Sequence, residues 1–147
     1  MSVNQDLLSI LEEGRHLVLQ EFPQAQFCEA EWRRQESDAW RFVYNDPATR
    51  GTVLLVHGAN GFETPRHIDA GWLEDRVIPF PVPMRLKVAE NLAQKAGFDG
   101  ELDRITLRWP LFPGSNEPCY RFDIPSQHVH VFVGVYTHQV HTSPLNV

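Results

Sequence analysis

The sequence lacks most features of secreted, membrane and nucleic-acid-binding proteins. Its 147 residues include two cysteines, Cys28 and Cys119, without the spacing of a metal or redox motif, so we expect two buried free thiols. No segment approaches the roughly 18 apolar residues that span a bilayer. No stretch concentrates lysine and arginine, so neither a nucleic acid nor an anionic membrane is an expected partner.

Residues 1–16 have no basic leader and no long apolar run, so they do not form a secretory signal as they stand. We therefore expect a cytoplasmic protein, unless a leader preceded this sequence. The formal net charge is -6. Hydrophobic residues make up 42% of the chain, with four tryptophans and nine phenylalanines. This apolar content is enough for one compact domain with a core.

Motifs for catalysis are also missing. Residues 53–61, VLLVHGANG, look like the oxyanion-hole turn of α/β-hydrolases, but none of the six serines lies in the Gly-x-Ser-x-Gly elbow that this chemistry needs. Gly58 and Gly61 are not followed by the Lys-Ser/Thr of a phosphate-binding loop. Because no nucleophile–base pair can be nominated, we predict that the protein is not an enzyme and uses no cofactor.

The segment at residues 6–22 has the apolar spacing of an amphipathic helix, with side chains recurring at steps of three and four. Ser2 or Asn4 can cap its start, and Pro23 marks its end. Gly14 lies on the apolar stripe. Glycine costs about 1 kcal/mol of helix propensity relative to alanine. Close approach of a sheet is therefore the expected reason for it.

A second helix is predicted at residues 84–96. Its apolar stripe includes Leu86, Ala89 and Leu92. Pro83 suits the first turn of this helix, and Gly97 suits its C-terminal cap.

In much of the remaining sequence, apolar and polar residues alternate with the period of two that is typical of β-strands. At residues 28–33, apolar side chains alternate with Glu29 and Glu31, and a strand that begins near Arg104 repeats the pattern. Further strands are expected at residues 40–44, 51–57, 120–124 and 128–136, with a short edge near Val140.

The elements follow the order helix, three strands, connector, helix, three strands. This order predicts an α+β fold with two helix-plus-antiparallel-meander repeats, in which the helices pack on one face of an antiparallel sheet. The first repeat covers residues 1–64 and the second covers 84–147, within one compact domain. The proline-rich connector at 65–83 is expected to lie across the surface, with a short strand near residues 76–78.

The two halves share a short motif. Trp40-Arg41-Phe42 leads, eleven residues after Phe42, into a strand that begins at Val53. In the same way, Tyr120-Arg121-Phe122 leads, nine residues after Phe122, into a strand that begins at Val131. A repeat of this kind indicates a scaffold and does not specify a reaction.

Two loops rich in aromatic residues are the candidate interaction sites. One holds Trp72 and Phe80 beside several prolines, and the other is the tip at residues 109–113. Rigid aromatic loops often anchor a protein partner, but they also fold back to cap a sheet. In the binding interpretation, the aromatic residues anchor the partner and the acids orient a basic one. The predicted contact residues are Trp72, Glu74, Asp75, Phe112, Asn116 and Glu117. We predict a non-enzymatic protein-binding module, for example an inhibitor, an immunity protein or a chaperone-like regulator. The sequence makes no prediction of its oligomeric state.

The alternative is a small-ligand or metal-binding domain that uses the strand histidines. His128 and His130 are two residues apart on a predicted strand, hence on one face, and His138 follows. Two imidazoles on one face can share a metal, but no carboxylate or cysteine close in sequence completes the site. We therefore expect no metal and keep these three histidines as the alternative.

The second half resembles PepSY-like domains over residues 84–142. The resemblance rests on a helix that ends in Ala-Gly, the segment Cys119-Tyr120-Arg121-Phe122, the strand at residues 131–133 and a closing turn near residues 137–140. Residues 6–64 resemble a degenerate copy, and two fused units are also the plan of the β-lactamase inhibitor protein. The chain departs from the family pattern at Gln139, where glycine is usual. The resemblance implies peptidase inhibition or protein binding, without catalytic residues.

Overall fold

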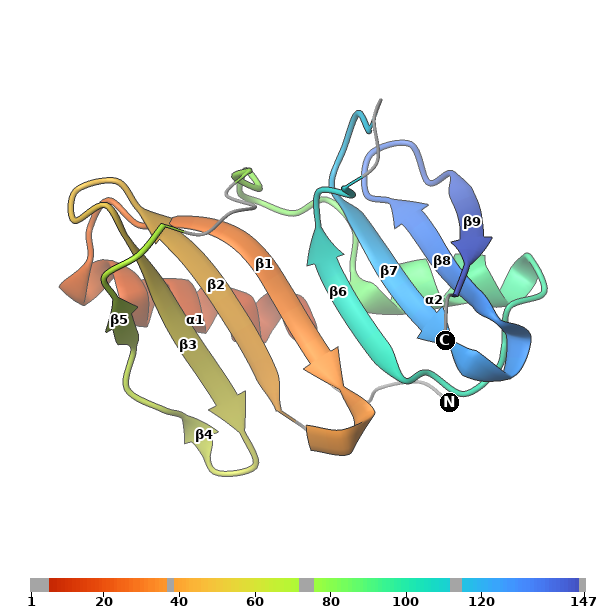
Figure 1. Cartoon of the computed structure of the whole chain (residues 1–147), viewed down its shortest axis with the longest axis horizontal. Coiled ribbons are helices and arrows are strands. Elements are labelled where there is room, and N and C mark those ends of the chain that lie inside the picture. Colours follow the sequence, from red (N-terminus) through yellow and green to blue (C-terminus); the bar gives the residue numbers. More distant parts are fainter. Residues whose placement is uncertain (1–5, 37–38, 72–75, 112–114, 146–147) are drawn as a thin grey trace.

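The computed structural model describes residues 6–36, 39–71, 76–111 and 115–145 of the chain. These residues form two α-helices and one antiparallel sheet of nine strands (Figure 1). The helices are α1 (Leu7–Glu21) and α2 (Leu86–Lys95). The strands are β1 (Gln26–Arg33), β2 (Trp40–Asp46), β3 (Gly51–Gly58), β4 (Gly61–Phe62), β5 (Arg66–Ile68), β6 (Arg104–Arg108), β7 (Cys119–Ile124), β8 (Val129–Gly134) and β9 (Val140–Pro144). The predicted α+β class with an antiparallel sheet is confirmed.

The sheet is continuous from the first half of the chain to the second. Its strand order is β4-β3-β2-β1-β6-β7-β8-β9, and β5 also pairs with β3. The central pair is β1 and β6, in which Glu31 lies opposite Thr106 and Trp32 lies opposite Ile105. In Figure 1 both helices lie behind the sheet, α1 behind the strands that follow it and α2 behind β7 and β8.

Helix α1 begins one residue after Asp6, which is its N-cap. The Ser9 backbone N–H and hydroxyl donate to the Asp6 carboxylate at 3.5 and 2.9 Å, which satisfies one of the free N–H groups of the first turn. Asp6 therefore takes the role expected of Ser2 or Asn4, which lie outside the described residues. A Cβ atom at Gly14 would meet Leu55 Cδ2 at 2.7 Å, so the prediction of a close helix–sheet approach is confirmed.

Helix α2 begins later than the sequence predicts. Its N-cap is Arg85, so Pro83 precedes the helix instead of forming its first turn. The physical reason is that Met84 is drawn into the core, where it is 2% exposed and its carbonyl accepts a hydrogen bond from the Tyr120 hydroxyl at 2.8 Å. Gly97, which follows the helix, has φ of +98° and confirms the expected cap.

Most described residues of the connector at 65–83 are exposed, as expected, but two of its apolar side chains and the Met84 that follows it reach the core. Ile78, Val82 and Met84 are each at most 7% exposed and belong to the core. Residues 76–78 do not form a strand, although the Ile78 N–H donates to the Phe27 carbonyl at 2.8 Å. Prolines in this segment prevent a regular hydrogen-bonded ladder, but they do not prevent burial of the apolar residues between them.

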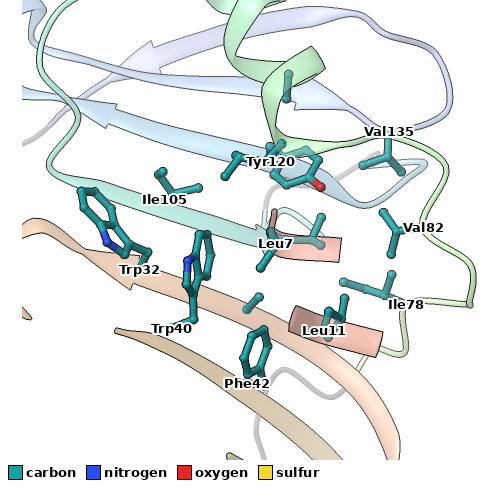
Figure 2. Close-up of a cluster of buried hydrophobic side chains, with 14 of the residues drawn as sticks. Leu7, Leu11, Trp32, Trp40, Phe42, Ile78, Val82, Ile105, Tyr120 and Val135 are labelled. Atoms are coloured by element: carbon teal, nitrogen blue, oxygen red, sulfur yellow. The ribbon is translucent and has the colours of Figure 1, made fainter. Parts of the chain in front are cut away.

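The hydrophobic core lies between the helices and the sheet and continues across the β1–β6 pair (Figure 2). Trp40 and Phe42 stack with ring centroids 6.5 Å apart, and Tyr120 and Phe122 stack at the same 6.5 Å. All four side chains are at most 1% exposed. The aromatic residues of each triplet therefore build the core, and the arginine between them points to the opposite face of the sheet.

Candidate functional site

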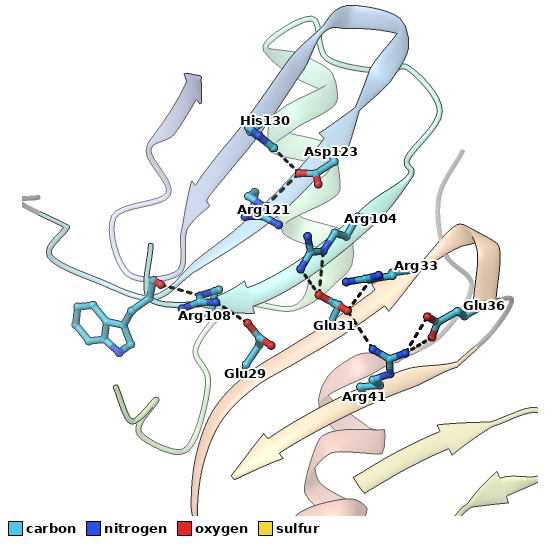
Figure 3. Close-up of polar contacts among 11 residues, drawn as sticks. Glu29, Glu31, Arg33, Glu36, Arg41, Arg104, Arg108, Arg121, Asp123 and His130 are labelled. Carbon is cyan, nitrogen blue, oxygen red and sulfur yellow. Dashed lines mark hydrogen bonds and ion pairs between the residues drawn. The ribbon is translucent and has the colours of Figure 1, made fainter. Parts of the chain in front are cut away.

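The face of the sheet that the helices leave uncovered, here the open face, holds a network of charged side chains (Figure 3). Strand register places them in three rows across the sheet. The central row runs through Arg41, Glu31, Thr106, Arg121 and Phe132, each directly opposite the next. One flanking row holds Glu29, Arg108 and Cys119, and the other holds Arg33, Arg104, Asp123 and His130.

Glu31 is the centre of this network. Its side chain is 8% exposed, and its carboxylate meets Arg33 Nε at 2.9 Å and Arg41 Nη1 at 3.6 Å. Arg104 on β6 also donates to it from both Nε and Nη2. Arg33 and Arg104 lie directly opposite each other in the β1–β6 pair. Glu31 therefore reduces the repulsion between two like charges that face each other across the central seam of the sheet.

The neighbouring charges form smaller groups. Arg108 Nη1 donates to Glu29 at 2.7 Å, again across the β1–β6 pair. Asp123 lies between a histidine and an arginine: His130 Nδ1 is 2.7 Å from Asp123 Oδ1, and Arg121 Nε is 3.2 Å from the same oxygen. Burial lowers the pKa of Arg121; Arg104 and Arg108 lower it further, while Asp123 and Glu29 raise it.

The open face is positively charged although the protein is acidic. Its strands present six arginines, at positions 33, 41, 66, 104, 108 and 121, against three acids, at 29, 31 and 123. With Glu36, which binds Arg41 from just after β1, the face still has more cations than anions, whereas the whole chain has a formal charge of -6. Beside this network lies a hollow of about 570 Å³. It is lined by Glu29 and Glu31, by the arginines at 33, 41, 66, 104 and 108, and by Val43, Leu54 and Val56. The arrangement suits an anionic group attached to an apolar one.

A second, smaller cavity of about 270 Å³ lies at the β7–β8 side of the open face. Arg108, Arg121 and Cys119 line it together with Phe132, Pro110 and Leu111. Burial raises the pKa of the Cys119 thiol to about 12, and the charge of Glu117 adds to this effect. The thiol is therefore neutral at physiological pH, the reverse of what activates a cysteine nucleophile.

Comparison with known proteins yields a fold and no family. No protein-family model and no curated protein matches the chain. The structure is similar to the crystal structure of a putative lipoprotein from Clostridium difficile 630, with a TM-score of 0.68 and 10% sequence identity. The alignment covers 95% of this chain and 100% of that one. At this identity the likeness shows a shared fold alone.

These comparisons leave the resemblance to PepSY-like domains as a prediction, since no family model supports it. The cytoplasmic location is also still a prediction. Among the described residues, neither helix is long and apolar enough to cross a membrane.

The aromatic loops that sequence analysis singled out are described in part. Trp72, Glu74, Asp75 and Phe112 lie outside the described residues. Their neighbours pack inward. The Trp109 indole N–H donates to the Val77 carbonyl at 3.0 Å, with Arg76 stacked 3.7 Å from the ring centroid.

The other described aromatic residue of these loops, Phe80, also packs inward. Its ring lies 5.7 Å from that of Phe27, and Arg15 lies 4.7 Å from its centroid. For the described part of these loops, the capping interpretation is therefore the one that the contacts support.

The two remaining predicted contact residues differ from each other. Asn116 is exposed. Glu117 accepts hydrogen bonds from the Tyr136 N–H at 2.7 Å, from the Thr137 N–H at 3.0 Å and from the Thr137 hydroxyl at 2.6 Å. Burial acts to raise the pKa of Glu117, but these hydrogen bonds outweigh it and lower the pKa below its usual value. Glu117 thus closes the turn that follows β8, a role that its sequence position does not reveal.

We expect Glu117→Gln to be less stable than the native chain at pH 7. A lowered folded-state pKa stabilises the fold above the unfolded value of 4.5, and this stabilisation is lost as pH falls through the folded pKa. The stability difference between the two proteins should therefore shrink below about pH 4.5. Urea unfolding at pH 7, 5 and 3 measures it, and a difference that stays constant across this range would contradict the assignment.

The three histidines of the metal alternative occupy different settings. His130 lies on β8 and contacts Asp123, whereas His128 and His138 are exposed turn residues with φ of +54° and +64°. Within the described ranges, no group of three or more histidine, cysteine, aspartate or glutamate side chains is placed to hold a metal ion. The metal alternative therefore gains no geometric support from this part of the chain.

Sequence reasoning did not nominate the arginines of the open face. The available signal was the alternation within β1 and β6, which places their charged residues on one side of each strand. What it could not supply was the pairing of β1 with β6, which brings these charges together.

Proposed function

We propose that the chain is a non-enzymatic module that binds a protein partner through the open face of its sheet. The observation that carries this proposal is the positively charged hollow of about 570 Å³ on a sheet face that no described helix covers. Inhibitors, immunity proteins and chaperone-like regulators are modules of this kind.

The chemistry of the face favours an acidic partner segment. Arg33, Arg41 and Arg104 already share Glu31, yet their side chains stay 33 to 44% exposed. Arg41 also binds Glu36. Arg33 and Arg104 hold Glu31 and still present donors to solvent, so a second carboxylate can join them without breaking the network. The aliphatic side chains of the hollow then cover apolar groups of the same segment. This partner has the opposite charge to the basic partner predicted from Glu74, Asp75 and Glu117.

We also propose that the two halves are duplicated helix-plus-meander units, as the sequence motif and the PepSY-like resemblance suggest. The support is the element order and the matching 6.5 Å ring stacks of the two triplets. In this view, Arg41 and Arg121 hold corresponding places in the two units. Arg41 donates twice to Glu36, at 2.8 Å each. The two units have therefore diverged in how they use that arginine.

The test combines capture with a charge reversal. The native chain is used to capture partners from the source organism, and the affinity of each purified candidate is then measured for Arg66→Glu and Lys87→Glu. Arg66 is exposed and lines the hollow, whereas Lys87 is exposed on α2, behind the sheet. A true partner should bind Arg66→Glu at least about tenfold more weakly and Lys87→Glu normally, with binding that weakens as salt rises. Equal effects of both reversals would refute the open face as the binding surface.

A further inference from the structure

The small cavity beside the β6–β7 hairpin is a candidate ligand site in its own right. It has a volume of about 270 Å³, just below the roughly 300 to 1,000 Å³ of sites for drug-sized molecules. Its size therefore suits one group about as large as an amino-acid side chain. Phe132, Pro110 and Leu111 supply apolar walls, and Arg108 and Arg121 supply the charge.

The two arginines differ in how far the protein satisfies them. Arg108 donates to Glu29 at 2.7 Å and to the Trp109 carbonyl at 3.1 Å. Arg121 is 22% exposed, and its Nε lies 3.2 Å from Asp123 without the alignment of a hydrogen bond. No hydrogen bond joins the Arg121 guanidinium to another described residue. The Asp123 carboxylate is also in contact with His130, with Oδ1 2.7 Å from Nδ1. A half-buried guanidinium in this state has donors available for a further anion.

We propose that this cavity binds a ligand in which a single carboxylate is attached to an apolar group. The carboxylate pairs with the Arg121 guanidinium, with Arg108 beside it, and the apolar group lies against Phe132 and Leu111.

The choice of a carboxylate follows from the walls. A guanidinium fork matches the two oxygens of a carboxylate in a bidentate pair. A phosphate or sulfate has further oxygens that would face Phe132, Pro110 and Leu111, and burying a polar atom without a hydrogen bond in such surroundings is unfavourable. The Cys119 thiol stays neutral because its pKa is raised to about 12, so it does not repel the anion.

This inference goes beyond the proposed function, because binding of a small ligand in this cavity does not require a protein partner on the open face. Two sources supply the same chemistry: a free carboxylic acid, and the C-terminal residue of a polypeptide. Three probes separate them, namely 3-phenylpropanoate, the peptide N-acetyl-Ala-Ala-Phe with a free C-terminal carboxylate, and the amide of that peptide.

Calorimetry on the full chain measures each affinity, and side-chain NMR of the arginine Nε–H groups shows which arginine responds. At least one carboxylate probe should bind at millimolar concentration or below, and the amide should bind at least about tenfold more weakly than its acid. If 3-phenylpropanoate binds more tightly than the peptide acid, the site is assigned to free acids. Binding of the peptide acid alone assigns it to a chain terminus.

Variants test the residues. Arg121→Gln should lower the affinity for the carboxylate probe at least about tenfold. Lys87→Gln on α2 should change this affinity by no more than about twofold. If Arg121→Gln fails to fold, Leu111→Asp replaces it, because Leu111 is 68% exposed and a negative charge there should repel the ligand. Two results would overturn the proposal: equal affinities for the acid and the amide, or no binding of any probe at concentrations up to about 10 mM. Neither result would bear on Arg66 and the larger hollow, so the two proposals fail separately.

Discussion

Glu31→Gln should lower the free energy of unfolding by about 2 to 3 kcal/mol. The substitution keeps the shape of the side chain but removes the anion that three arginines share. Arg33 and Arg104 then oppose each other across the β1–β6 pair without compensation. Removing one partner of a fully buried ion pair costs roughly 3 to 5 kcal/mol. We expect less here because the arginines are 33 to 44% exposed.

Urea unfolding measures this loss as a lower midpoint at unchanged slope. Glu36→Gln is the matched control, because it removes a carboxylate that is 38% exposed and that also binds Arg41. An exposed pair of this kind is worth about 0.5 kcal/mol. The double variant Glu31→Gln with Arg104→Gln should recover part of the loss, because it also removes one of the opposed charges. Similar losses for Glu31→Gln and Glu36→Gln would show that the network adds little to stability.

Tyr120→Phe should cost about 1 to 2 kcal/mol, whereas Tyr44→Phe should be neutral or slightly stabilising. Both tyrosines are at most 1% exposed, and burial raises the pKa of both phenols, so both are neutral. The Tyr120 hydroxyl donates to the Met84 carbonyl at 2.8 Å. Loss of this donor leaves a buried carbonyl unsatisfied, which costs about 1 to 3 kcal/mol. The Tyr44 hydroxyl has no hydrogen-bond partner among the described residues.

Thermal and urea unfolding of the two variants provides the comparison, and near-ultraviolet circular dichroism checks that both cores stay packed. The Tyr120–Met84 bond ties the connector to β7 just before α2 begins. A smaller loss for Tyr120→Phe than for Tyr44→Phe would mean that the connector is held by apolar packing of Ile78 and Val82 alone.

The sequence predicted local structure well where the period was regular. The helix at residues 6–22 and the strands around Glu29 and Arg104 follow from apolar spacing, because that spacing reflects which side of an element is buried. The start of α2 was misplaced because the burial of Met84 and its bond to Tyr120 depend on a strand 36 residues away. The burial of Ile78 and Val82 in the connector was missed for a similar reason: proline indicates irregular backbone, and irregular backbone can still carry buried side chains.

The aromatic loops show what composition leaves open. Phe80 and Trp109 are held within the chain by Arg15, Phe27, Arg76 and Val77, whereas the predicted anchors Trp72 and Phe112 lie outside the described residues. Composition does not separate an aromatic residue that binds a partner from one that caps a sheet. The groups that donate hydrogen bonds to Glu117 belong to Tyr136 and Thr137, about 20 positions further along the chain. No local sequence pattern predicts this contact.

The sequence by itself determined which side chains share a face: alternation in β1 and β6 separates their charged residues from the core, because successive side chains of a strand point in opposite directions. Only the tertiary structure decided which charges meet. Glu31 and Arg104 are 73 residues apart, and their contact depends on the register in which β1 pairs with β6. That register minimises the exposure of two distant apolar faces at once, so it is a property of the whole core. An acidic chain without a basic segment thereby acquires a basic surface.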